Sequence, residues 1–63
     1  MTLKELLNAV YFDEHEPVLI IVNNSTYDNG RVYDSWLDVP EDVTTFTVDA
    51  IYNTPTMLRI DLC

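Results

Sequence analysis

The sequence predicts an α+β fold in two layers, with an N-terminal helix packed on a small, mostly antiparallel four-stranded sheet. Two observations predict this architecture. Apolar residues recur at helical spacing near the N-terminus, and four later segments rich in apolar or β-branched residues are separated by turn-forming residues. A chain of 63 residues has room for one domain, so we expect residues 1–63 to fold as a single unit.

The helix is expected over residues 2–12. Thr2 can cap its N-terminus, and Glu5, three residues later, can complete a capping box. An apolar stripe at positions i, i+3, i+4 and i+7 consists of Leu3, Leu6, Leu7 and Val10. Pro17 prevents the helix from continuing into the next segment.

Four strands are expected after the helix. The continuous apolar run Val18–Val22 is typical of a strand that is buried on both faces. Asp28-Asn29-Gly30 provides residues that tolerate positive φ, which predicts a hairpin turn into a strand over residues 31–37. Pro40 is placed to open a short helical turn or a type I turn.

The last two strands follow an alternating pattern. Residues 44–53 alternate between Phe46, Val48, Ala50 and Tyr52 on one side and polar residues with Ile51 on the other. Residues 57–62 predict Leu58, Ile60 and Leu62 facing inward and Arg59 and Asp61 facing outward. One helix covers only one sheet face, so Ile51, Tyr33 or Trp36 should point away from it. We therefore expect the second face to bind a partner or a second copy.

Charge limits the possible partners. Eleven acidic and three basic residues give a net charge of −8, which argues against direct binding to nucleic acid or to an anionic membrane. The electrostatic field of such a charge favours binding to a basic protein surface. The single cysteine, Cys63, favours a reducing compartment, and the N-terminus resembles neither a signal peptide nor a membrane span. We expect a cytoplasmic protein of a bacterial host.

The sequence offers little for catalysis or metal binding. His15 lies among Asp13, Glu14 and Glu16, but consecutive residues in a connector diverge, and no second histidine completes a metal site. The segment around Gly30 fails the calcium-loop pattern, because Tyr27 and Trp36 fall at ligand positions. A single glycine excludes a phosphate-binding loop. We expect no enzyme, no cofactor and no metal; a small acidic metal binder is the least favoured alternative.

Residues 27–42 are the candidate partner-binding site. Their acidic residues would supply charge, and two aromatic residues would serve as anchors. If residues 31–37 are extended, Asp34 and Asp38 share one face at a separation of about 13 Å, an interval that resembles a line of phosphates. The competing interpretation is a solvated face with ordinary turn aspartates. The predicted binding residues are Asp28, Tyr33, Asp34, Trp36, Asp38, Glu41 and Asp42.

The chain resembles very small proteins carried by phages and mobile elements of Gram-positive bacteria. The resemblance rests on "MTLKELL", the following apolar strand, "VYDSWLDVPEDV" and the closing "LRIDL". It implies a stoichiometric binder, because the wider phage repertoire includes anti-CRISPR proteins and DNA mimics; it assigns no functional residue. The sequence thus predicts a non-catalytic acidic inhibitor that occupies a basic, nucleic-acid-binding surface. The alternative is a homodimer or larger assembly formed through Leu19, Ile21 and Trp36 on the second sheet face.

Overall fold

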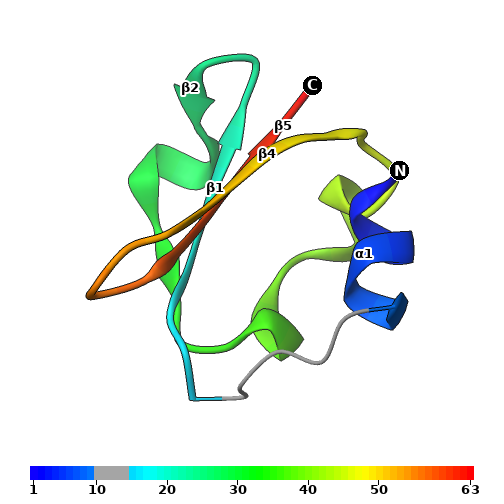
Figure 1. Cartoon of the computed structure of the whole chain (residues 1–63). Coiled ribbons are helices and arrows are strands. Elements are labelled where there is room, and N and C mark those ends of the chain that lie inside the picture. Colours follow the sequence, from blue (N-terminus) through cyan, green and yellow to red (C-terminus); the bar gives the residue numbers. More distant parts are fainter. Residues whose placement is uncertain (10–14) are drawn as a thin grey trace.

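The computed structural model describes residues 1–9 and 15–63 and shows a small α+β fold with one N-terminal helix and a mixed sheet (Figure 1). The sheet has the strand order β2-β1-β5-β4, and β3 pairs with β1 on the same side as β2. The α-helix and strands are α1 (Leu3–Ala9), β1 (Val18–Val22), β2 (Ser25–Thr26), β3 (Val32–Tyr33), β4 (Val48–Asn53) and β5 (Leu58–Leu62). Three 3₁₀ segments are η1 (Tyr27–Gly30), η2 (Trp36–Asp38) and η3 (Glu41–Val43).

Helix α1 begins with the predicted capping box. The Thr2 N–H donates to Glu5 Oε1 at 3.0 Å, and the Glu5 N–H donates to Thr2 Oγ1 at 3.2 Å. The bond from the Thr2 backbone, followed by the bond from its hydroxyl, lowers the pKa of the Glu5 carboxyl below 4.5. This contribution to stability is therefore present above pH 4.5 and is lost as the pH falls through the lowered pKa. The predicted end of the helix and Val10 lie outside the described residues.

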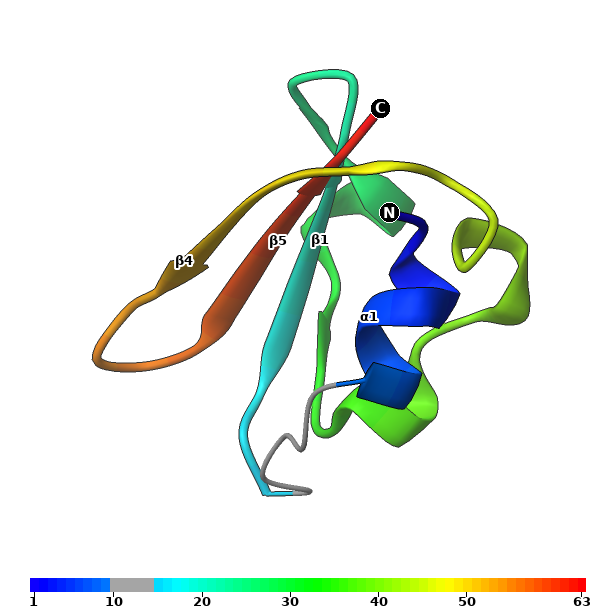
Figure 2. The ribbon, with the colours of Figure 1, turned by 45° about the vertical axis from the view of Figure 1, so that its right-hand side comes forward.

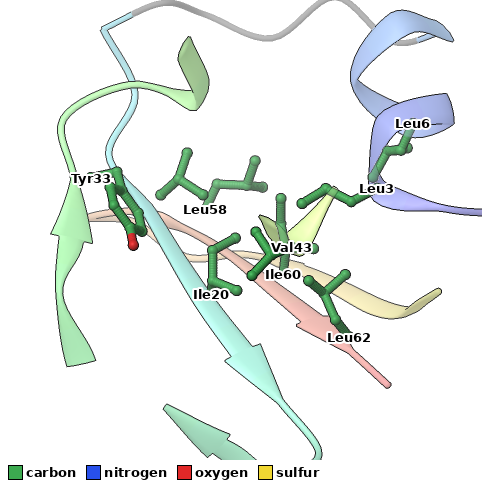
Figure 3. Packing of buried hydrophobic residues seen from close by; sticks show 9 residues of the cluster. Leu3, Leu6, Ile20, Tyr33, Val43, Leu58, Ile60 and Leu62 are labelled. Carbon is green, nitrogen blue, oxygen red and sulfur yellow. The ribbon is translucent and has the colours of Figure 1, made fainter. Parts of the chain in front are cut away.

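The hydrophobic core lies between the sheet and α1 (Figure 3). Its centre is the parallel pair β1–β5, in which Val18 lies opposite Leu58 and Ile20 lies opposite Ile60. The buried cluster consists of Leu3, Leu6, Val18, Ile20, Tyr33, Val43, Leu58, Ile60 and Leu62. The predicted alternation of β5 is confirmed, because its leucines and isoleucine are buried while Arg59 is exposed. Each fully buried leucine or isoleucine stabilises the fold by about 1.5–3 kcal/mol.

The described sheet is mostly antiparallel, as predicted, since three of its four strand pairings are antiparallel, but two details differ. Among residues 1–9 and 15–63 the sheet has five strands and not four, and its central pair runs parallel, with Val18–Val22 in register with Leu58–Leu62. The hairpin turn after β1 is also earlier than predicted. Asn23 and Asn24 adopt φ values of 50° and 66°, which asparagine tolerates, so the chain reverses there and Val22 pairs with Ser25.

The Asp28-Asn29-Gly30 triplet does adopt positive φ, at 52°, 57° and 79°, but it forms a loop inside an edge strand. Strands β2 and β3 both pair antiparallel with β1, where Thr26 lies opposite Ile21 and Val32 lies opposite Leu19. Along the edge strand, Val32 lies six positions after Thr26, whereas their partners in β1, Leu19 and Ile21, are only two positions apart. The edge strand therefore contains four more residues than β1 over this stretch. The four extra residues are Tyr27–Gly30, which loop out as η1.

Strand β4 is shorter than the predicted strand over residues 44–53, and a bulge changes which of its side chains face the helix. Strand β4 begins at Val48, and its pairing with β5 shifts between Val48 and Ala50. The extra residue, Asp49, reverses the alternation. Val48 pairs with Leu62 on the helix side, whereas beyond the bulge Ile51 takes that side by pairing with Ile60. The expectation that Ile51 points away from the helix is therefore wrong.

The two ends of the described chain meet at the start of β4. The Thr47 N–H donates to Cys63 O at 3.2 Å, and the Cys63 N–H donates to Thr47 O at 2.9 Å. The Val48 N–H donates to Met1 O at 2.8 Å, and Thr2 forms a β-bridge with Thr47. The helix start is thus tied to the sheet. Residues 44–46 are held against the start of the helix by the Leu3 N–H, which donates to Phe46 O at 2.9 Å.

The capping box generates the first testable prediction. Replacing Thr2 with alanine removes the side-chain oxygen that accepts the Glu5 N–H, and we expect the free energy of unfolding to fall by about 1 kcal/mol. The Thr2→Ser variant keeps that oxygen and should lose much less. Urea denaturation followed by circular dichroism measures both. Equal losses in the two variants would contradict a capping role for the Thr2 hydroxyl.

Candidate functional site

The five acidic residues of the predicted site are all exposed: Asp28, Asp34, Asp38, Glu41 and Asp42. Asp28 lies in η1 at the edge of the sheet. The other four lie in the segment that leads from β3 through η2 and η3 toward the start of α1 (Figure 2). We call residues 34–42 the acidic segment. It is fixed at its ends by β3 and by the Lys4 N–H, which donates to Thr44 O at 2.9 Å.

The predicted spacing of Asp34 and Asp38 is wrong. Extended pairing ends at Tyr33, and Trp36–Asp38 forms a 3₁₀ turn. The turn begins because the Leu37 N–H donates to the Ser35 hydroxyl at 3.2 Å, a cap that competes with strand geometry. Asp34 and Asp38 are therefore not on one face of a strand, and the interval of about 13 Å does not apply.

Tyr33 belongs to the core and not to the surface. It is only 3% exposed, and its pairing with Val18 places it on the helix side of the sheet, so the expectation that it points away is wrong (Figure 3). Its buried hydroxyl makes no hydrogen bond with the described residues. Burial is the main cause that raises the pKa of Tyr33, and the Asp28 carboxylate adds to it. Tyr33 thus has almost no accessible surface for a partner.

Trp36 is only partly available. It is half-buried and packs against the core cluster, on the helix side of the sheet. The next residue, Leu37, is instead 58% exposed. Sequence reasoning missed Leu37 because it assigned this segment to a strand. The available signal was Ser35, an N-cap residue that directly precedes the Trp-Leu-Asp turn.

The acidic segment has no cation of its own. Between Arg31 and Arg59 the sequence contains five acidic residues and no lysine or arginine. Both arginines already have partners: the Arg59 side chain donates to the two Asp61 carboxylate oxygens at 2.8 and 3.1 Å, and Arg31 lies 3.9 Å from the Asp28 carboxylate. The negative charge of residues 34–42 is consequently not neutralised by sequence neighbours.

The sheet face opposite α1 is built differently. We call it the open face; Figure 2 shows α1 on the other side of the sheet. The strand register places its residues in two rows, Val32–Leu19–Arg59–Tyr52 and Thr26–Ile21–Asp61–Ala50. The Arg59 guanidinium lies 5.0 Å from the centre of the Tyr52 ring. Arg59 and Asp61 cancel each other, so this face has no formal net charge.

The described residues contain no group of three or more histidine, cysteine, aspartate or glutamate side chains that could hold a metal ion. The predicted connector cluster is only partly described, since Asp13 and Glu14 lie outside the described residues, while His15 is exposed. In the same residues, no helix has the length and apolar character needed to cross a membrane.

Comparisons with known proteins found no matching family model, no similar curated protein and no similar solved structure. A proposal for the function of this chain therefore rests on its own residues. The features that stand out are an exposed acidic segment with one exposed leucine, a sheet face without net charge, and strand β4 at an edge of the sheet.

The buried hydroxyl of Tyr33 generates a second prediction. Removing it in Tyr33→Phe deletes an unpaired polar atom, so we expect stability at pH 7 to stay within about 1 kcal/mol or to rise. The raised pKa of Tyr33 means that the unfolded chain ionises first, so its contribution to stability is present below the ordinary pKa of 10.0 and is lost as the pH rises further. The variant should lose stability less steeply above pH 10.0.

Denaturant unfolding of both proteins at a series of pH values measures this difference. Tyr52→Phe is the matched control, because it removes the same hydroxyl from a tyrosine that is exposed on β4. A large loss of stability at pH 7 in Tyr33→Phe, or identical alkaline profiles for Tyr33→Phe and the parent protein, would contradict the assignment of Tyr33 as a buried, unpaired phenol.

Proposed function

We propose that this protein is a non-catalytic acidic binding module, of the phage-inhibitor type, that occupies a basic and normally nucleic-acid-binding surface of a host protein. The observation that supports the proposal best is the acidic segment. Four exposed carboxylates, on Asp34, Asp38, Glu41 and Asp42, lie within nine residues without any basic side chain. A surface that binds phosphates attracts such a segment, because both present closely spaced negative charge.

The acidic segment also has an apolar contact residue. Charged groups at the rim of an interface accelerate association, whereas desolvated apolar groups near its centre supply most of the affinity. Leu37 is exposed and directly precedes Asp38 within η2. We therefore assign Leu37 the anchoring role that the sequence assigned to Tyr33, with Trp36 supporting it from the core side.

The alternative function is a homo-oligomeric assembly protein that associates through the open face. Leu19 and Ile21 do lie on this face, as that alternative requires, whereas Trp36 packs against the core cluster instead. Ile21 is already only 7% exposed within one chain. The more exposed apolar residues of this face, Val32 and Tyr52, lie at opposite ends of one row with Arg59 between them, so its apolar area is not continuous. We regard the acidic segment as the better supported site.

A capture experiment tests the proposal. The tagged protein is mixed with lysate from Gram-positive bacteria at low and at high salt, and bound proteins are identified by mass spectrometry. We expect a nucleic-acid-binding host protein that high salt or competing DNA displaces. With the purified target, the Asp38→Asn/Glu41→Gln variant should bind roughly tenfold more weakly at low salt, since two exposed ion pairs are each worth up to about 1 kcal/mol.

The matched control is Asp49→Asn/Glu16→Gln, which removes the same two charges outside the acidic segment. Its binding should stay close to that of the parent protein, and Leu37→Ala should weaken binding at high salt as well as at low salt. Equal effects of the two charge variants would show that only total charge matters. Recovery of the bait alone, or of targets that DNA does not displace, would overturn the proposal.

A further inference from the structure

Strand β4 forms an open edge of the sheet (Figure 2). It pairs with β5 on one side, and among the described residues no strand pairs with its other side. Met1 covers only the beginning of this outer edge, where its carbonyl accepts the Val48 N–H at 2.8 Å. Beyond this point Ile51 and Tyr52 are large apolar residues that are 42% and 49% exposed. Residues 49–53 thus offer a free strand edge with apolar side chains.

The hydrogen-bonding pattern shows which backbone groups face outward. The Thr54 N–H donates to Met57 O at 3.0 Å, which closes the β4–β5 turn. Hydrogen-bonded pairs alternate along an antiparallel ladder, so Tyr52 bonds to Arg59 while Ile51 and Asn53 direct their N–H and C=O groups away from β5. No described residue forms a hydrogen bond with these outward N–H and C=O groups. An exposed row of unpaired backbone groups is a template for another strand.

We propose that β4 pairs antiparallel with β4 of a second copy around a two-fold axis at Ile51, which joins two sheets into one continuous sheet. This arrangement is isologous, so each chain contributes the same edge. Ile51 then lies opposite Ile51 of the second copy and exchanges two backbone hydrogen bonds with it. Asn53 lies opposite Asp49, and Tyr52 lies opposite Ala50, so a large side chain meets a small one.

The residues of β4 favour this register over the one in which the two-fold axis moves by one residue to Tyr52. An axis at Tyr52 would place Asp49 opposite Pro55, which has no N–H to donate, and would place Ile51 opposite Asn53. With the axis at Ile51, the single carboxylate of the strand, on Asp49, faces the amide of Asn53 and not another carboxylate. No lysine, arginine or proline lies between residues 48 and 53, and the bulge at Asp49 lies near the start of the strand, so the edge from Ala50 to Asn53 lacks the features that block pairing.

A second copy fits this edge because most of the negative charge lies elsewhere. The acidic segment is in another part of the fold, and only Asp49 contributes charge to β4. The net charge of −8 still makes two copies repel each other, so screening by salt should strengthen the dimer. The contact is a short strand edge, which is smaller than the roughly 1,000 Å² of a stable interface, so we expect concentration-dependent association.

Sedimentation equilibrium under reducing conditions tests the proposal on the whole chain. We expect the average mass to rise with concentration from the 7.3 kDa of one chain toward twice that value, and to rise further in about 0.5 M salt. Hydrogen exchange measured by NMR should show the Ile51 and Asn53 amides becoming protected as concentration increases, while protection of the Tyr52 amide stays constant.

Ile51→Pro is the decisive variant, because it removes an outward N–H that β5 does not use, and it should abolish dimerisation at about 1 mM. Ile51→Val keeps the N–H and should retain dimerisation; thermal unfolding checks that both variants fold. A monomer at about 1 mM in high salt would overturn the proposal. A dimer that persists in Ile51→Pro would also overturn it. So would a dimer whose formation leaves the Ile51 and Asn53 amides unprotected, because that result would indicate association through the open face.

Discussion

The parallel pairing of β1 with β5 is the interaction on which the rest of the structure depends. It brings residues 18–22 and 58–62 together across most of the chain, and it places their inward side chains in one layer beneath α1. Closing so long a loop costs conformational entropy, which the burial of Val18, Ile20 and Ile60 must offset. The other strands add to this pair: β2 and β3 extend it beside β1, and β4 extends it beside β5.

Residues that tolerate left-handed backbone conformations determine how the sheet is extended beside β1. Asn23 and Asn24 reverse the chain, and Asp28, Asn29 and Gly30 let it loop out and return to the same edge. The returning strand places Tyr33 against Val18 on the core side. From there the Ser35 cap turns the chain away from the sheet, so residues 34–42 do not continue as a strand, and their four carboxylates face solvent while Trp36 packs against the core.

Local signals in the sequence predicted local structure well. The capping box of Thr2 and Glu5, the short helical turn opened by Pro40 and the alternation of β5 each depend on residues within a few positions of one another. The errors concern partners that are distant in sequence. Nothing near Val18 indicates that it pairs in parallel with Leu58, and nothing near Ile51 shows that a bulge at Asp49 reverses the strand. For the site, the acidic residues were predicted as exposed, but burial of Tyr33 depends on the same distant pairings.

The fold keeps its charge and its open backbone edge apart. Asp34, Asp38, Glu41 and Asp42 lie in segments that are held beside α1, whereas β4 lies at the far side of β5 and contains a single aspartate. On the open face, Arg59 cancels Asp61, so these two residues add no net charge to the sheet. Two copies that joined at β4 would present two separate acidic segments, one on each chain. Association through β4 and binding through the acidic segment are therefore compatible, because neither uses the residues of the other.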